Sequence, residues 1–214
     1  MNIPLQIKLK KETHRKIAYA QDLIIEEVYK FLPGAVLHGG TAIWRIYSGR
    51  RFSEDLDFYL TKKMKKIEEL FDSLEKKGFK IIKKKISKNS IYSELESDRT
   101  SVRLEATFQN IPKILSDYEL SDGNKITIYS ISVEDFIIEK IKAYIKRYKI
   151  RDLWDIFFLL KEAKDKNKIK PYLKQLIENY KTPLDEEDLK TIILEGIVPT
   201  SKEMFGYIKQ KWEK

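Results

Sequence analysis

Asp55 and Asp57 are separated by one residue in the segment 55–60, where apolar and polar residues alternate. A period of two is typical of a half-buried strand, so both carboxylates are expected on one face. Two carboxylates are hard oxygen ligands of the kind that hold Mg²⁺ together with substrate phosphates. A solvated strand face gives the same spacing, so the pair alone leaves both interpretations open.

Glu105 lies on the polar side of a second alternating segment, residues 101–108. If the two strands are neighbours, a third carboxylate joins the pair. Three converging acids repel one another unless cations neutralise them, as metal ions do in phosphoryl-transfer sites. The alternative partner of Glu105 is Arg103 or a lysine.

Gly39, Gly40 and Thr41 stand between a short apolar run and a helical segment, upstream of the acids. Glycines let a ligand approach the backbone closely, and amides at a helix N-terminus favour phosphate, with the Thr41 hydroxyl as a further donor. The spacing matches neither a Walker A motif nor a dinucleotide-binding fingerprint. The glycine pair can also be a simple turn.

A cluster of charged residues follows in the second half of the chain. Lys140 and Arg147 are seven apart and share a helix face, so two cations can reach one anion. Asp152 and Asp155 are likewise neighbours on a helix. The alternative is a solvated helix face on which Arg151 and Asp155 form a weak i,i+4 pair.

The composition limits the classes of protein to consider. The chain has 214 residues, a formal net charge of +9 and no cysteine. Disulfides, thiol nucleophiles and zinc–thiolate sites are therefore excluded, and the positive charge favours phosphate-rich partners. No apolar run approaches the roughly 18 residues of a membrane span, so a soluble, cytoplasmic protein without a membrane partner is expected.

The elements that must position these residues follow from periodicity. Helical spacing predicts helices over 11–32 and 62–77, which end at Pro33-Gly34 and Gly78. Short apolar or alternating runs predict strands over 35–37, 55–60, 79–86, 101–108 and 125–130, the last after a hairpin-like turn at 122–124. The remaining patterns predict helices over 136–148, 153–163, 172–180, 184–194 and 205–212. This order predicts an α+β core over residues 1–131 and a helical lobe over 132–214, packed on the core.

The residues named above lie within longer runs: L-H-G-G-T-A-I-W-R, then R-R-F-S-E-D-L-D-F, V-R-L-E-A, and E-K-I-K-A-Y-I-K-R-Y-K-I-R-D-L-W-D. Together these runs, from about Lys11 to Leu160, resemble the AbiEii/AbiGii toxin family of nucleotidyltransferases. The resemblance implies a polymerase-β-like nucleotidyltransferase core, with a small mixed sheet and flanking helices. It leaves the last fifty residues uncovered.

The same resemblance implies roles for single residues. Asp55 and Asp57 would bind metal, with Glu105 in the third carboxylate position, where the wider superfamily commonly has Asp. Gly39, Gly40, Thr41 and Ser53 would contact the nucleotide phosphates, although Gly-Thr replaces the usual Gly-Ser. Lys140 would contact the triphosphate, with Arg147 beside it, and Asp152 and Asp155 match later acidic positions of a supporting or catalytic kind.

The implied activity is transfer of a nucleoside monophosphate from an NTP to an acceptor hydroxyl, with Mg²⁺ or Mn²⁺, by the toxin of a toxin–antitoxin pair. A tRNA or other RNA acceptor agrees with a basic stretch, and a cognate antitoxin would be a further partner. The stretch comprises Lys62, Lys63, Lys65, Lys66, Lys76, Lys77, Lys80, Lys83, Lys84, Lys85 and Lys88. The alternative for these lysines is a solvated face. The alternatives for the function are a glycosyltransferase, a protein-modifying nucleotidyltransferase and a silent binding module.

Overall fold

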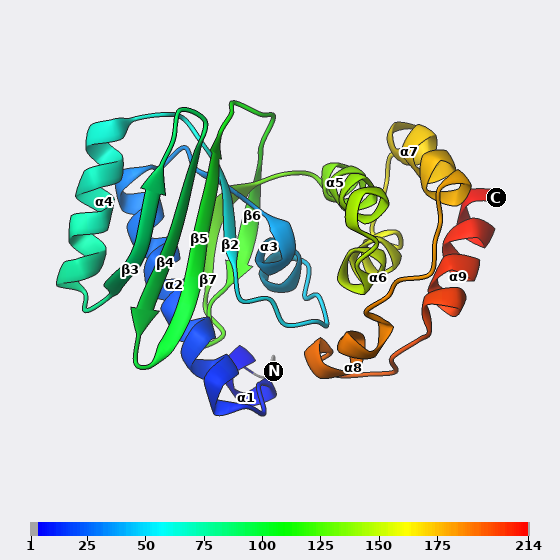
Figure 1. The fold of residues 1–214 in the computed structure, drawn as a ribbon, viewed down its shortest axis with the longest axis horizontal. Helices are drawn as coiled ribbons and strands as arrows, with labels where there is room; N and C mark the ends of the chain where they lie inside the picture. Colours follow the sequence, from blue (N-terminus) through cyan, green and yellow to red (C-terminus); the bar gives the residue numbers. More distant parts are fainter. Residues whose placement is uncertain (1–3, 214) are drawn as a thin grey trace. The chain divides into compact units, whose positions relative to one another are not determined.

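The computed structural model describes residues 4–213, and the chain divides into two units. The first unit comprises the chain up to Ser48 and Phe52–Ile131, and the second comprises Gly49–Arg51 and the chain from Ser132 onward. A sheet with helices forms the first unit, and the second is mainly helical (Figure 1). The segment Gly49–Arg51 therefore belongs with residues far from it in sequence.

Among the described residues of the first unit, seven strands form one mixed sheet in the order β3-β4-β5-β2-β1-β7-β6. The pairs β2–β5 and β1–β7 are parallel, and the other neighbours are antiparallel. The elements are α1 (Leu5–Lys8), α2 (Glu12–Phe31), β1 (Val36–His38), α3 (Gly39–Ile46), β2 (Leu56–Leu60), α4 (Met64–Lys76), β3 (Lys80–Ile86), β4 (Ser90–Ser97), β5 (Thr100–Phe108), β6 (Ile114–Glu119) and β7 (Lys125–Ser130).

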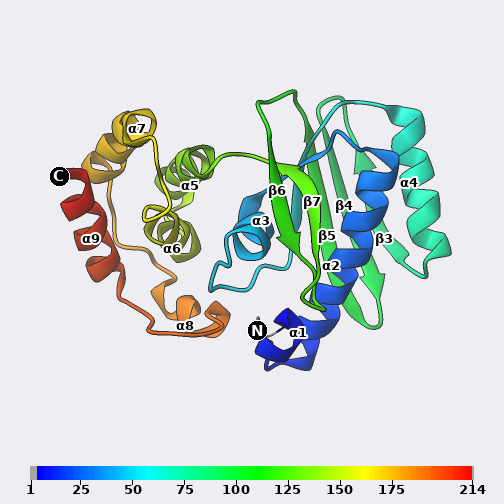
Figure 2. The same ribbon diagram turned by 180° about the vertical axis from the view of Figure 1, so that it is seen from behind.

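Helices α2 and α4 lie together over one face of this sheet (Figures 1 and 2). Leu56, Phe58 and Leu60 of β2 are buried, as the alternation predicts. Asp57 and Tyr59 alternate with them and are only half-buried. Asp57 and Tyr59 therefore point to the face opposite the buried core residues.

The apolar residues at helical spacing in α4 form one buried face, as expected from the sequence. Ile67, Leu70, Phe71 and Leu74 are all buried. The helix ends before Gly78, whose φ of 90° lies in the left-handed region that glycine tolerates. Both the helix over this segment and its glycine stop are confirmed.

Strand β4 was not predicted from the sequence. Its buried face carries Ile91, Ser93 and Leu95, so a serine interrupts the apolar alternation. The Ser93 hydroxyl donates a hydrogen bond to the Leu104 carbonyl at 3.0 Å, which satisfies the buried polar group. A buried serine of this kind hides a strand from a hydrophobicity pattern.

A buried arginine anchors α3, the helix that follows the glycine pair. The Arg45 side chain has no exposed surface and forms an ion pair with Asp22 of α2. Its Nε also donates to the Tyr118 hydroxyl of β6 at 3.0 Å. Helix α3 is thereby held to a helix and a strand, which fixes the position of its first turn.

The second unit contains α5 (Val133–Arg147), α6 (Ile150–Leu159), α7 (Lys166–Glu178), the 3₁₀ turn η1 (Glu186–Asp188), α8 (Leu189–Ile192) and α9 (Ser201–Glu213). Ser132 caps α5 by accepting a hydrogen bond from the Asp135 amide at 3.2 Å. Helix α5 packs against α6 and α7, and α9 against α6. Within residues 4–213 no helix is long and apolar enough to cross a membrane.

The helix predicted over 184–194 is wrong in length: only the turn η1 and the short α8 form there. The acidic residues of this segment serve more distant groups instead. Asp185 accepts from the Ile150 amide, and Glu186 accepts from the amide and the hydroxyl of Ser201. These bonds favour a turn over a continuous helix.

Candidate active site

A row of polar side chains crosses the face of the sheet opposite to the buried residues of β2. Register places Asp57 of β2 opposite Glu105 of β5, and Glu105 opposite Tyr92 of β4. The row continues to Lys85 of β3 at one end and to His38 of β1 at the other. The sheet therefore brings two of the three predicted carboxylates side by side on parallel neighbouring strands.

Asp57 lies directly against the glycine pair. A Cβ added at Gly39 would lie 2.1 Å from the Asp57 Oδ2 atom, and Gly39 has a φ of 76°. Only glycine combines this backbone angle with so close a carboxylate. Helix α3 begins at Gly39, and the amides of a first turn have no acceptor within their own helix.

Asp55 precedes β2 and is held by an arginine. Arg103 of β5 donates from Nε and Nη2 to the two Asp55 carboxylate oxygens at 2.7 and 2.6 Å. The alternative considered from the sequence, a pair between Arg103 and Glu105, is not what forms here, although the Arg103 charge is felt by Glu105. Asp55 thus already has a bidentate cationic partner, whose side chain is 45% exposed.

The surroundings of Glu105 change the pKa of its carboxyl. Burial raises the pKa of its carboxyl above the ordinary value, and the negative charges of Asp57 and Asp55 raise it further, against the opposing charge of Arg103. The three acids therefore interact electrostatically, as the sequence predicted for strands lying close together. A cation bound among them would relieve this repulsion.

Thr41 is buried, and its hydroxyl bonds within the chain. It donates to the Asp55 backbone carbonyl at 2.5 Å, and Gln21 of α2 donates to the Ser53 carbonyl at 2.9 Å. Gln21 also donates to the Thr41 hydroxyl at 3.4 Å. These bonds tie α3 to the segment that leads into β2, so Thr41 and Ser53 position Asp55 and Asp57.

The donor set on this face fits a hard divalent cation, because it consists of carboxylate oxygens that repel one another. Within residues 4–213, no three His, Cys, Asp or Glu side chains are grouped so that they could hold a metal ion as they stand. Both Asp55 oxygens are bonded to Arg103, which takes Asp55 out of such a group. Metal binding by Asp55, Asp57 and Glu105 stays a prediction.

The later charged residues form a network in the second unit, buried at Lys140, Asp152 and Asp155 and exposed at Arg147. The Lys140 ammonium lies 2.7 Å from Asp155 and 3.8 Å from Asp152. Arg51 donates two hydrogen bonds of 2.6 Å to Asp155, and Arg147 donates two, of 2.7 and 2.8 Å, to Asp152. Lys140 and Arg147 therefore both reach the Asp152 carboxylate, an anion of the same unit.

Burial would raise the pKa of Asp155, but the charges and hydrogen bonds of Arg51 and Lys140 outweigh it and hold the pKa below the ordinary value. Asp155 is thus a buried anion compensated by two cations. The weak pair with Arg151 considered from the sequence is not the contact that Asp155 makes; Arg151 is exposed. The network stabilises the helical unit, and a triphosphate contact by Lys140 and Arg147 stays a prediction.

Three features of these clusters were not assigned from the sequence: Gln21, Arg51 and the pairing of Arg103 with Asp55. Arg51 is 104 residues from its partner, and its neighbour Arg50 is exposed, so nothing local distinguishes the two arginines. For Arg103 a signal did exist. Arg103 is two residues before Glu105 on β5, so both side chains lie on the same face of the strand. Pairing of β2 with β5 therefore places Arg103 on the face that carries the acids.

We expect Gly39→Ala to reduce the activity of this site by about 10²-fold, because the added Cβ displaces the Asp57 carboxylate. The left-handed backbone adds a stability cost of about 1–2 kcal/mol. Rate and urea unfolding measured on the same preparation separate the two effects. Gly206→Ala on α9, where an added Cβ meets nothing within 4 Å, is the matched control and should leave the rate unchanged. Equal rates in both variants would contradict the close approach of Asp57.

The fold that carries this site is shared with solved structures, one of which is a nucleotidyltransferase toxin. JHP933 from Helicobacter pylori matches with a TM-score of 0.64 and 21% identity, covering 95% of this chain and 93% of that one. The nucleotidyltransferase toxin MenT4 from Mycobacterium tuberculosis matches with a TM-score of 0.66 and 15% identity, covering 94% and 82%. At these identities the likeness concerns the fold.

The family itself is shown by sequence. The model of the family described as nucleotidyl transferase AbiEii toxin of type IV toxin–antitoxin systems matches residues 28–210, and the chain belongs to this family. The protein is accordingly a nucleotidyltransferase, and its family pairs a toxin with an antitoxin. No protein with a curated description matches the chain. The resemblance found in the sequence motifs is confirmed, but its expected extent is wrong: the match begins at residue 28 and also covers residues 161–210, which the motifs left uncovered.

Proposed function

We propose that the protein transfers a nucleoside monophosphate from an NTP to an acceptor hydroxyl of tRNA or another RNA. The observation that carries this proposal is the contact between Asp57 and Gly39. It joins a carboxylate pair to the first turn of a helix, which are the two features that a nucleotide with its metal requires. Glu105 in the opposite register position extends the acidic site.

In this proposal Asp55, Asp57 and Glu105 hold Mg²⁺ or Mn²⁺. The metal, when bound, supplies neutralisation of the charge on the phosphate oxygens. The Gly39–Thr41 turn donates backbone amides to the nucleotide phosphates, and Ser53 stands beside it. Arg103 would have to release Asp55 for all three carboxylates to serve as ligands, because it is bonded to both Asp55 oxygens.

The proposed reaction forms one bond and breaks one. The acceptor hydroxyl oxygen bonds to the α-phosphorus, the bond from that phosphorus to the bridging oxygen breaks, and pyrophosphate leaves with the bonding electrons. The hydroxyl proton passes to solvent. No covalent enzyme intermediate is needed, and positioning with charge neutralisation supplies most of the catalysis in such transfers.

Support for an RNA acceptor comes from charge, although the predicted basic stretch is only partly available. Lys84 is paired with Glu68 and Lys66 with Glu69, whereas Lys83 and Lys85 extend from β3 on the face that carries the acids. A net charge of +9 agrees with a polyanionic partner. The solvated-face alternative thus accounts for some of the lysines.

Incubation of the protein with each NTP labelled at the α-phosphorus, with Mg²⁺ or Mn²⁺ and total tRNA, tests the proposal. Label should appear on RNA in a denaturing gel and disappear when the metal is chelated. Label on lysate protein instead would select the protein-modifying alternative, and turnover of sugar nucleotides would select a glycosyltransferase. Absence of label, together with no metal-dependent heat stabilisation by any NTP, would leave a silent binding module.

Lys140→Met decides whether the buried network also serves the nucleotide. At a temperature where the variant is folded, a triphosphate contact predicts a raised KM for NTP. An unchanged KM with a lowered melting temperature would restrict Lys140 to a structural role. Far-UV circular dichroism establishes the temperature range in which the comparison holds.

A further inference from the structure

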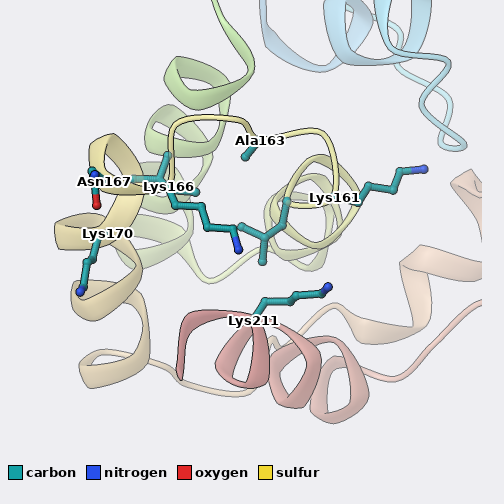
Figure 3. A pocket seen from close by; sticks show the side chains of 8 residues that line it. Lys161, Ala163, Lys166, Asn167, Lys170 and Lys211 are labelled. Atoms are coloured by element: carbon teal, nitrogen blue, oxygen red, sulfur yellow. The ribbon is translucent and has the colours of Figure 1, made fainter. Parts of the chain in front are cut away.

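A cavity of about 440 Å³ lies in the helical unit, and none of the residues that line it has been assigned a role above. Its lining comes from the turn after α6, from α7 and from α9: Leu160, Lys161, Ala163, Lys166, Asn167, Ile169, Lys170 and Lys211. Figure 3 shows Lys166 extending from α7 toward the middle of the cavity and Lys211 along the opposite wall on α9. No acidic side chain is among the described residues that line it, so the cavity suits an anion.

A second groove of about 400 Å³ adjoins the first, since Lys161 lines both. It is lined by Arg50, Trp154, Phe157, Phe158, Lys161, Ile197, Pro199 and Tyr207. Phe157 packs edge to face on Tyr207, with ring centroids 5.1 Å apart, and lies 5.8 Å from Trp154. Phe157 and Tyr207 are only half-buried, so the groove presents aromatic rings beside two cations.

The combination of lysines in the cavity and aromatic rings in the groove favours one class of ligand over others. A single-stranded nucleic acid offers phosphates for lysines and flat bases for aromatic rings, in alternation along one chain. An acidic peptide would use the lysines but has no general need for the rings. A small inorganic anion would fill only the first cavity. Charge and ring chemistry together therefore favour a polynucleotide strand lying across both.

We propose that this surface binds a single-stranded segment of RNA, with phosphates on Lys161, Lys166 and Lys211 and a base against Phe157 and Tyr207. The choice of RNA rests on the proposed function, in which RNA is the acceptor. The surface itself lies wholly in the helical unit and uses residues that the nucleotide site does not contain. It gives the last fifty residues a function in holding the acceptor.

Binding of a fluorescent single-stranded RNA oligonucleotide to the full chain, without NTP, tests the surface. The double variant Lys166→Glu/Lys211→Glu should weaken binding by about tenfold or more. It should also reduce the slope of log affinity against log salt by about 0.7 for each phosphate that the variant no longer neutralises. Lys174→Glu/Lys202→Glu, on the same two helices and outside the cavity, is the matched control and should change affinity little.

Loss of an aromatic side chain in the groove should affect RNA affinity and its salt dependence differently from loss of the lysines. Tyr207→Ala should weaken binding by roughly 5- to 150-fold, as for the loss of one stacked base, and leave the salt slope unchanged. Melting temperatures of all variants show whether a loss of RNA affinity reflects unfolding. Phe157→Leu, which keeps an apolar side chain, provides a second test of the aromatic contact. Equal binding of a matched DNA strand would still support the surface, because phosphates and bases make the contacts.

Two results would overturn the inference: equal losses in both double lysine variants, or full RNA affinity in the cavity variant. Binding of polyglutamate that depends on the same lysines, without RNA binding, would assign the surface to an acidic protein instead. Failure of this inference is distinct from failure of the proposed function. A cavity variant that labels RNA normally would refute only the surface, whereas lysine-dependent RNA binding by a chain that labels nothing would refute only the reaction.

Discussion

Asp57→Asn should lower nucleotide transfer by about 10³-fold or more, because one carboxylate charge is lost where a metal and phosphates are proposed to meet. The substitution keeps the size of the side chain, so its packing against Gly39 should survive. Removal of one of three mutually repelling acids should leave the melting temperature unchanged or higher. Initial rates with labelled NTP, at saturating Mg²⁺, measure the effect.

The matched control is Asp117→Asn, which makes the same change at an exposed position on β6. It should retain the wild-type rate. A wild-type rate in Asp57→Asn would remove this residue from the site, and a comparable loss in both variants would point to a general effect of charge. Partial rescue by Mn²⁺ in Asp57→Asn alone would support metal binding at this position.

Arg51→Met should lower the free energy of unfolding by about 3–5 kcal/mol, the range for breaking a buried ion pair by removal of one partner. Asp155 would keep Lys140 but lose two hydrogen bonds of 2.6 Å. Arg151→Met makes the identical change on an exposed side chain of the same unit and should cost less than about 0.5 kcal/mol. Urea unfolding followed by circular dichroism compares the two.

The pH dependence of this effect has a definite sign. The pKa of Asp155 is lower in the folded chain than its ordinary value of 3.8, so the carboxylate stabilises the fold above that pH. The stabilisation is lost as the pH falls below about 4, where the unfolded chain takes up the proton more readily. The difference between wild type and Arg51→Met should therefore shrink in acid, and a difference independent of pH would contradict the ion pair.

Residues 55–60 and 101–108 could be placed from the sequence because their alternation reports burial directly. That the two strands are neighbours was an assumption there, and the parallel register that brings Asp57 beside Glu105 now supplies it. Arg51 could not be found, since its partner is distant in the chain and a buried arginine has no hydrophobic signal. The same holds for Arg45, whose burial depends on Asp22 and Tyr118 in two other elements.

The segment Gly49–Arg51 has a consequence for how the chain can be cut. It leaves the first unit after Ser48, bonds to the second through Arg50 and Arg51, and returns at Phe52. A fragment that starts at Ser132 would contain Asp155 and Lys140 but lack the arginine that completes their network, and a fragment that stops at Ile131 would carry that arginine without its carboxylate. Expression of either half should give poorly soluble material, and co-expression of both halves should restore folding, because the helical unit is assembled from two separate stretches of chain.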